Sequence, residues 1–409
     1  MRVDTMRAID RWVGVPLCFT LTIIHRIGSL LRTRAERPIR RILFIELSEM
    51  GSTILVDPAL QKARRKLGAE LYFLIFARNK DSLSLTGTIP ADHVRTIREN
   101  NLFLLLFDTM GYLFWVRKMQ IDTVVDLELF SRFTALLSGL SGCTRRVGFY
   151  SFHNEGLYRG EMLTHRVAYN PHIHIAKNFM AMINALLAGQ EEIPYSKTLI
   201  KDSELTLPRF SCSRGERDQV RDTIRAAATP SDPDAYHLVL INPNASELLP
   251  QRRWMPDRYE ALIGKILAHR SDVLVLLTGA PGERDEAEAM RNRIDDKRCI
   301  NFAGALKLTQ LPVLYSMAAL MVTNDSGPGH FSSITDLPTF VLFGPETPAL
   351  YGSLGNGTAI YAGLACSPCV SAANHRKTPC TENKCLQAIS VDQVFAAIRP
   401  VLDELPEIA

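Results

Sequence analysis

The chain has 409 residues, of which 46% are hydrophobic and 22% are charged, and its formal net charge is +4. This composition is that of an ordinary globular protein, and it excludes a disordered or fibrous chain. The length predicts two domains. Residues 42–409 contain no basic stretch interleaved with aromatic residues, so nothing indicates a nucleic-acid-binding protein.

The positive charge is concentrated at the N-terminus. Residues 1–41 contain nine arginines and three acidic residues, a charge of +6 that leaves −2 for the rest of the chain. The uncharged run WVGVPLCFTLTII, residues 12–24, is too short to span a bilayer, which takes ~20 apolar residues. We expect residues 1–40 to form a basic, apolar arm that lies in the plane of a membrane surface. A spanning anchor and a helix packed on the protein's own body are the alternatives.

Apolar runs of strand length alternate with helix-like segments from residue 41 onward. The strands predicted in the first half are 41–47, 70–76, 93–97, 122–127 and 145–149, and the helices are 52–68, 101–119 and 129–140. Residues 195–235 are polar and interrupt the pattern. The strands predicted after this interruption are 237–243, 272–279, 299–304, 320–324 and 339–344.

Continuous apolar strands alternating with helices predict parallel sheets covered on both faces. The predicted fold class is therefore α/β, with two doubly wound, Rossmann-like domains in tandem over residues 41–200 and 201–409. We expect ligands to bind in the cleft between the domains.

Four stretches carry a resemblance to a known family. In chain order they are RILFIELSEMGSTILVDPAL (41–60), DTVVDLELFSRFTALLSGLSGCTRRVGF (122–149), INPNASELLPQRRWMPDRYEALI (241–263) and TNDSGPGHFSSITDLPTFVLFGPETP (323–348). Together they resemble glycosyltransferase family 9, the ADP-heptose:lipopolysaccharide heptosyltransferases of the GT-B fold.

The resemblance implies an inverting transfer of a heptose-like sugar from a nucleotide-diphospho-sugar to lipopolysaccharide or another cell-envelope glycan. It implies no catalytic cofactor or metal. With the basic arm, it also implies a peripheral location on the cytoplasmic face of the bacterial inner membrane, with a glycolipid acceptor. A catalytically silent homologue that binds nucleotide or glycolipid as a scaffold is the alternative.

TNDSGPGH predicts part of the donor site because polar residues follow a strand at the start of a helix. Gly327 permits close backbone approach, and the following helix N-terminus would offer free N–H groups to a diphosphate. Ser326 and His330 can hydrogen-bond phosphate or sugar oxygens, and Asp325 is expected to orient the loop or accept from a sugar hydroxyl. An ordinary helix cap is the alternative interpretation.

Other donor-site candidates lie in the same half of the chain. Arg252 and Arg253 can stabilise a leaving diphosphate, and the resemblance favours Arg252; a solvated basic pair is the alternative. Glu283 matches a family glutamate near the donor nucleoside, although it is equally suited to a helix N-terminus. Asn244 and Ser246 follow a strand and are candidate phosphate or ribose contacts.

The first motif departs from the family, whose Met-Gly-Asp pattern supplies the general base. This chain has Ser52 where the family has aspartate, and a serine cannot serve as the base at neutral pH. The replacement candidates are Glu49, Glu46 and Asp57, in that order. The absence of any base is the alternative.

Three arginines of the first domain, Arg132, Arg145 and Arg146, are candidates for binding anionic groups of the acceptor, as the family's basic residues do. An ordinary structural role is the alternative for each of them.

Four cysteines are clustered near the C-terminus. Cys366, Cys369, Cys380 and Cys385 have the spacing C-x2-C-x10-C-x4-C, which suits a structural zinc site. Disulfides or redox-labile thiols, and free thiols, are the alternatives.

Overall fold

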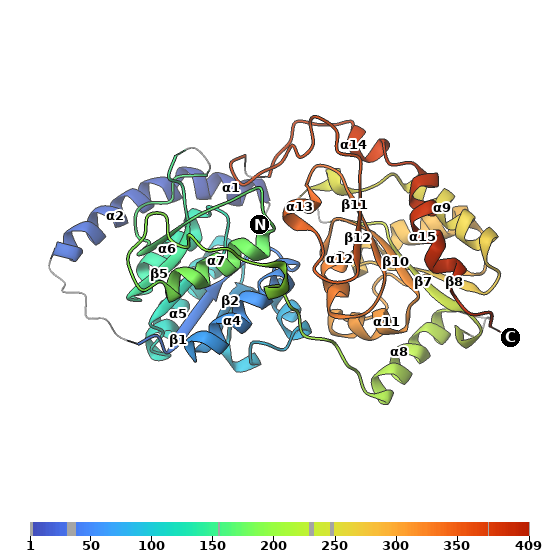
Figure 1. Ribbon diagram of the computed structural model, residues 1–409, viewed down its shortest axis with the longest axis horizontal. Helices are drawn as coiled ribbons and strands as arrows, with labels where there is room; N and C mark the ends of the chain where they lie inside the picture. Colours follow the sequence, from blue (N-terminus) through green and yellow to red (C-terminus); the bar gives the residue numbers. More distant parts are fainter. Residues whose placement is uncertain are drawn as a thin grey trace. The chain divides into compact units, whose positions relative to one another are not determined.

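The computed structural model describes residues 3–30, 38–153, 156–228, 233–245, 249–374 and 376–408. The chain divides into two compact units. Unit 1 comprises Met1–Thr206 together with Ser371–Arg376, and unit 2 comprises Leu207–Val370 together with Lys377–Ala409. Figure 1 shows a sheet with flanking helices in each unit.

Unit 1 is built on a six-stranded parallel sheet with the strand order β3-β2-β1-β4-β5-β6. Its strands are β1 Arg41–Ile45, β2 Glu70–Phe76, β3 Val94–Ile97, β4 Thr123–Asp126, β5 Arg145–Tyr150 and β6 His165–Ala168. Its helices are α1 Val3–Trp12, α2 Gly14–Leu30, α3 Ser52–Leu55, α4 Asp57–Leu67, α5 Leu102–Lys118, α6 Arg132–Leu140 and α7 Ile175–Leu187, with short 3-10 turns η1 Ala77–Leu85, η2 Ala91–His93 and η3 Asp202–Glu204.

Unit 2 repeats the architecture, with the strand order β12-β11-β10-β7-β8-β9, again entirely parallel. Its strands are β7 His237–Asn242, β8 Val273–Leu277, β9 Cys299–Asn301, β10 Leu320–Asn324, β11 Thr339–Phe343 and β12 Gly357–Tyr361. Its helices are α8 Arg214–Ala227, α9 Pro256–His269, α10 Arg284–Ile294, α11 Leu311–Met317, α12 Gly327–Phe331, α13 Pro348–Tyr351, α14 Lys384–Gln387 and α15 Val391–Asp403, with 3-10 turns η4 Pro233–Ala235, η5 Pro250–Arg252, η6 Pro281–Glu283, η7 Leu308–Gln310 and η8 Ser332–Ile334.

The predicted α/β class with two doubly wound sheets is confirmed. Each of the ten predicted strands is present, and the two strands that were missed, β6 and β12, lie at sheet edges. The single helix predicted over 52–68 is divided at Val56 into α3 and α4, because Pro58 has no N–H for a continuous ladder. Gly68 ends α4 with a left-handed φ of 61°, as a glycine at this position permits.

Apolar side chains on both faces of each sheet form the cores. In unit 1, β1, β2 and β4 pack with Leu105, Tyr112 and Val116 of α5. In unit 2, β7, β8 and β10 pack with α9 and α15. Burial of the strands on both faces explains why they read as continuous apolar runs. In both sheets the strand order reverses at the middle pair, β1 and β4 or β7 and β10, and polar residues at the carboxyl ends of these strands are the expected ligand-binding groups.

Candidate active site

Asn324 organises the carboxyl edge of the sheet in unit 2. It ends β10, beside the end of β7, and its side chain is fully buried. Its Nδ2 donates to the Pro243 carbonyl at 2.7 Å, while its Oδ1 accepts from the Trp254 backbone N–H and the Tyr259 hydroxyl, each at 3.0 Å. One amide therefore fixes the loops that follow β7 and β10 and the start of α9.

Arg252 and Asp325 meet at this edge. The Arg252 Nη1 donates to the Asp325 carbonyl at 3.1 Å and lies 3.7 Å from its carboxylate. Burial raises the pKa of the Asp325 carboxyl, and the positive charge of Arg252 partly opposes that rise. The Arg252 Nε and the Asp325 Oδ2 are buried without a hydrogen-bond partner. The structure thus brings together two of the predicted donor residues.

Arg253 lies in a different environment from its neighbour. Its Nε and Nη2 donate to the Ala245 carbonyl, and its Nη1 lies 3.7 Å from the carboxylate of Glu286. Trp254 is buried and donates through Nε1 to the Ile389 carbonyl. Arg253 therefore braces the loop after β7, whereas Arg252 faces Asp325.

Asn244 and Glu283 lie near one another around Gly279. A Cβ added to Gly279 would lie 3.4 Å from the Asn244 Nδ2 and 2.8 Å from a carboxylate oxygen of Glu283. The Asn244 Nδ2 is buried without a hydrogen-bond partner. Glu283 accepts from the Ala280 N–H at 2.6 Å, so it performs the helix-start role that was its alternative interpretation. Ser246 lies outside the described residues.

The helical segment after Asp325 is short. Only one turn of helix, α12, follows, and a 3-10 turn, η8, continues it. The Ser326 hydroxyl donates to the Asn324 carbonyl at 3.2 Å and does not cap α12, while His330 is buried. A Cβ on Gly327 would lie 2.9 Å from the Phe331 ring. A side chain at position 327 would therefore require the Phe331 ring to shift.

Glu346 is a residue that the sequence analysis missed. It follows β11 in the GPETP segment, is 1% exposed, and its charge interacts with those of Asp325 and Arg252. Burial, assisted by the negative charge of Asp325, raises its pKa to about 8. Its position three residues after an apolar strand was a signal that could have identified it.

Glu49 is the most accessible acid of the first motif in unit 1. It lies in the loop between β1 and α3, and its side chain is 30% exposed. The Ser52 hydroxyl donates to its Oε2 at 3.2 Å, and the Arg376 guanidinium pairs with its Oε1. Arg376 belongs to the segment of the cysteine-rich region that packs in unit 1, and no sequence signal pointed to it.

Glu46 and Asp57 are both buried. Burial raises the pKa of Glu46 well above its ordinary value, and the charges of Glu128 and Asp126 act in the same direction. Burial also raises the pKa of Asp57, whose carboxylate accepts from Gln61 at 2.5 Å. Neither acid is as accessible as Glu49.

Glu128, which the sequence analysis also missed, holds the loop that carries Glu49. It lies two residues beyond β4, and its Oε1 accepts from the backbone N–H groups of Leu47 and Ser48 at 2.9 and 3.0 Å. Next to it, Asp126 forms a buried ion pair with Arg159. At the carboxyl edge of this sheet, Glu128 therefore fixes the loop that carries Glu49. The charge of Asp126 is balanced by Arg159.

The three predicted acceptor arginines do not join this cluster. Arg132 pairs with Asp10 of α1 at 3.1 Å and donates to the Tyr158 carbonyl at 2.9 Å. Arg145 and Arg146 begin β5 and so lie at the opposite, amino edge of the sheet. Arg146 donates to the carbonyls of Met162 and Cys143. Their role in acceptor binding remains a prediction.

Comparison with known proteins assigns the chain to a family. The sequence profile of glycosyltransferase family 9 (heptosyltransferase) matches residues 116–379, which is more than half of the chain. The chain belongs to glycosyltransferase family 9. It is therefore a glycosyltransferase, as the four motifs predicted.

Relatives within family 9 agree with this assignment. The chain is 24% identical to lipopolysaccharide heptosyltransferase 1 of Pseudomonas aeruginosa over 81% of this chain and 86% of that protein. It is 32% identical to lipopolysaccharide heptosyltransferase 2 of Salmonella typhimurium, but over only 25% of this chain and 30% of that protein.

Solved structures of family 9 show the same fold. The structure of Escherichia coli ADP-heptose lipopolysaccharide heptosyltransferase II matches 89% of this chain and 99% of that chain with a TM-score of 0.66 at 18% identity. Escherichia coli heptosyltransferase WaaC with ADP matches 88% of this chain and 99% of that chain with a TM-score of 0.59 at 15% identity. The predicted GT-B fold class is confirmed.

The predicted zinc site is not supported. Across the described ranges, which omit His375, no three His, Cys, Asp or Glu side chains form a group that could hold a metal ion. Cys366 is exposed, whereas Cys385 is buried in the core of unit 2, and all eight cysteines are free thiols. The four thiols therefore differ in burial, which a spacing pattern alone cannot reveal.

The arm folds as α1 and α2, and one side of α2 packs on α6. His25 bonds to the Gly139 carbonyl at 2.9 Å, and Cys18 is fully buried. This side of α2 therefore packs on the protein's own body, which was one of the alternatives for the arm. None of the described helices is long and apolar enough to cross a membrane.

Proposed function

We propose that this enzyme transfers heptose from an ADP-heptose-like nucleotide-diphospho-sugar to the core of lipopolysaccharide, with inversion at the transferred carbon and without a metal ion. The names of the relatives support the sugar and the acceptor. A family 9 structure with ADP, and another with ADP-2-deoxy-2-fluoro heptose, support the nucleotide.

The single observation that carries the proposal is the incompletely hydrogen-bonded polar set in unit 2. The Asn244 Nδ2, the Arg252 Nε and the Asp325 Oδ2 are all buried without a partner. Buried polar atoms almost always have partners, and leaving one without costs about 1–3 kcal/mol. A nucleotide-sugar offers phosphate oxygens for the two donors and hydroxyl groups for the carboxylate.

Arg252 is assigned to the leaving diphosphate. Its guanidinium is held on the Asp325 carbonyl, so its position is fixed before the ligand arrives. A preorganised cation stabilises the negative charge that develops on the leaving group. This assignment supports a reaction that proceeds without a metal ion.

Glu49 is assigned as the general base that removes the proton of the acceptor hydroxyl. It is the only one of the three candidate acids that is not buried. The Ser52 hydroxyl and the Arg376 guanidinium hold its carboxylate in one orientation. The family pattern has an aspartate at position 52. In this chain Ser52 instead orients the neighbouring acid Glu49.

Binding and transfer assays test the proposal. ADP and ADP-heptose should raise the melting temperature of the full chain more than UDP and UDP-sugars do, since a ligand that binds only the folded state stabilises it. With ADP-heptose and a lipopolysaccharide core that lacks the heptose, ADP release should be accompanied by heptosylated product. Equal stabilisation by all nucleotides, or ADP release without product, would contradict the assignment.

A further inference from the structure

The exposed side of α5 is apolar from its first turn to Phe114. Five apolar side chains that are each more than half exposed recur at helical spacing on this side: Phe103, Leu106, Phe107, Met110 and Phe114. At 100° per residue these positions fall within about 100° of arc, so they form one stripe. We call this stripe the α5 face. Such a contiguous apolar surface marks an interaction site.

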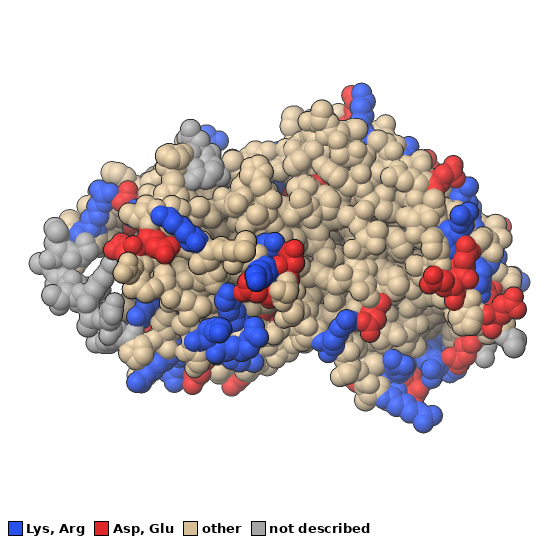
Figure 2. Space-filling model, in the orientation of Figure 1, with Lys and Arg blue, Asp and Glu red and all other residues tan. Residues whose placement is uncertain are grey.

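The exposed charged residues of α5 are all basic. Arg117 and Lys118 are exposed in the last turn of the helix, and their positions continue the same stripe. Beside the helix, Arg95 reaches Gly111, where an added Cβ would lie 2.7 Å from its Nη2. No exposed position of α5 carries an acidic residue. Elsewhere on the protein, acidic and basic residues are interspersed on the face shown in Figure 2.

The helix α5 is connected to the arm through α6. Arg117 donates to the Leu140 carbonyl at the end of α6, which links α5 to α6. The inner side of α2 packs on α6, and Met6 of α1 contacts the core cluster that contains the buried residues of α5. The helices α5, α6, α1 and α2 therefore pack together in unit 1.

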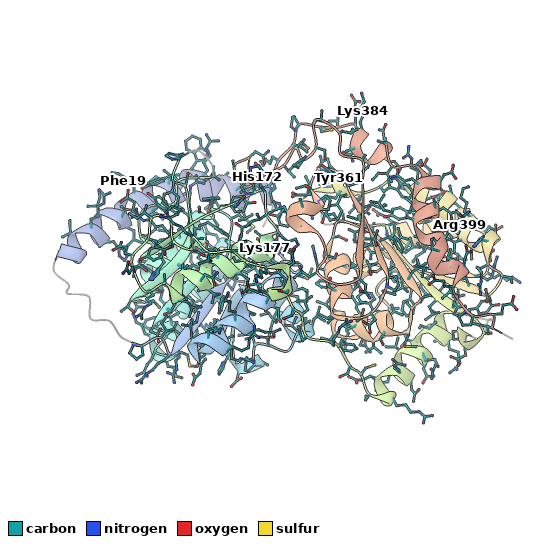
Figure 3. The ribbon with its side chains drawn as sticks, in the orientation of Figure 1. Phe19, His172, Lys177, Tyr361, Lys384 and Arg399 are labelled. Atoms are coloured by element: carbon teal, nitrogen blue, oxygen red, sulfur yellow. The ribbon has the colours of Figure 1, made fainter. Side chains whose placement is uncertain are left out.

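The outer side of α2 has the same character as the α5 face. Phe19, labelled in Figure 3, is 59% exposed, and Leu17, Ile23, Ile24 and Ile27 are also exposed. Among the described side chains of α2 the only exposed charged residue is Arg26.

We propose that the α5 face docks on an anionic lipid bilayer together with the outer side of α2, so that unit 1 contacts the membrane through its folded body as well as through its arm. Phenylalanine, leucine and methionine side chains would enter the acyl boundary, while Arg95, Arg117 and Lys118 would meet anionic headgroups. A bilayer matches the two properties of these exposed helix surfaces, apolar area and positive charge. A second copy of the chain would bring the same positive charges to the contact.

Flotation of the full chain with lipid vesicles tests the proposal without any sugar donor, so its outcome is independent of the proposed reaction. The probes are vesicles of phosphatidylethanolamine with phosphatidylglycerol, and vesicles of phosphatidylcholine alone. The test variant is Phe103→Ser, Phe107→Ser, Phe114→Ser. The matched control is Ile193→Ser, Leu199→Ser, which removes apolar side chains that are 74% and 84% exposed and lie outside α5.

The triple variant should bind anionic vesicles at least about tenfold more weakly than the wild type, because three aromatic side chains no longer enter the membrane. The control variant should bind like the wild type. An Arg117→Gln, Lys118→Gln variant should lose much of the preference for anionic vesicles. Equal melting temperatures would show that all variants are folded.

Wild-type affinity of the folded triple variant would overturn the proposal and leave vesicle binding to the arm alone. Sedimentation in the absence of lipid tests whether a second copy of the chain, and not a bilayer, covers the α5 face. If the wild type self-associates, fails to bind vesicles, and becomes monomeric on substitution of the three phenylalanines, the α5 face is a contact between copies of the chain and the proposal is wrong.

Discussion

Arg252 donates to the backbone carbonyl of Asp325, and its neighbour Arg253 donates to the backbone of Ala245 instead. Two adjacent arginines therefore serve different parts of unit 2. The sequence QRRW could not distinguish them, although the resemblance favoured the first. Their divergence provides a paired test of the donor site.

Arg252→Ala should weaken ADP binding by about 1.5–3 kcal/mol, the usual contribution of one charge-assisted hydrogen bond. Arg253→Ala should change ADP affinity much less, because its Nε and Nη2 both donate to the Ala245 carbonyl, whereas the buried Nε of Arg252 has no partner. Isothermal titration calorimetry on both variants measures the difference. An equal loss in both would assign the diphosphate to the pair and not to Arg252.

Glu49→Gln should lower kcat by roughly 10²–10⁴-fold with little change in donor affinity, because the amide keeps the shape but cannot accept a proton. Steady-state kinetics with a verified acceptor provide the measurement. Ser52→Asp should leave kcat unchanged or reduce it, because a second carboxylate beside Glu49 disfavours ionisation of both. A large gain of activity in Ser52→Asp would mean that the natural chain lacks a working base.

Glu346→Gln should change how stability depends on pH. The raised pKa of about 8 means that the folded protein holds a proton on Glu346 between pH 4.5 and about 8, whereas the unfolded chain releases it. Stability of the wild type therefore falls as pH rises through this window, by up to about 1.4 kcal/mol per pH unit from this group. Urea unfolding at pH 5.5 and pH 7.5 should show a smaller fall in the variant. Parallel pH dependences would refute the assignment of a protonated Glu346.

Asn324→Ala should destabilise unit 2 by ~3–5 kcal/mol, since it leaves the Pro243 carbonyl, the Trp254 N–H and the Tyr259 hydroxyl without their buried partner. Chemical denaturation followed by the fluorescence of Trp254, after replacement of Trp12 and Trp115 by phenylalanine in both proteins, measures this loss. A loss below about 1 kcal/mol would indicate that water replaces the amide.

Removal of divalent cations should leave the transfer rate unchanged, because the leaving diphosphate is assigned to Arg252. Rates measured with an excess of chelator and with added Mg²⁺ should agree. A rate that collapses with chelator and recovers with Mg²⁺ would show that the cation neutralises the leaving group.

The architecture was predictable because local and global signals agree in this chain. Doubly buried strands such as 70–76 read as unbroken apolar runs, and 101–119 read as one helix. The edge strand β12 was missed because its burial is mixed, with Thr358 and Ala359 exposed. At the site, Asp325 and Asn244 could be predicted because each directly follows a predicted strand in the sequence, and ligand-binding polar residues lie at the carboxyl ends of parallel strands.

Contacts made across long stretches of sequence could not be predicted. Glu128 holds the Leu47–Ser48 backbone from 80 or more positions away, and Arg376 reaches Glu49 from the other end of the chain. Such pairings depend on which loops the fold brings to one sheet edge. The cysteine spacing was misleading for the same reason: it reports distance along the chain and not how deeply each thiol is buried, which differs between Cys366 and Cys385.

The assignment of Ser371–Arg376 to unit 1 has a consequence for dissecting the protein. The segment returns to unit 1 from within unit 2, so the chain passes from one unit to the other three times. A fragment ending at Thr206 would contain every strand of its sheet but would leave Glu49 without its guanidinium partner. Cutting the chain near its midpoint therefore does not yield two complete units. A faithful version of unit 1 needs the hexapeptide supplied in trans or grafted by circular permutation.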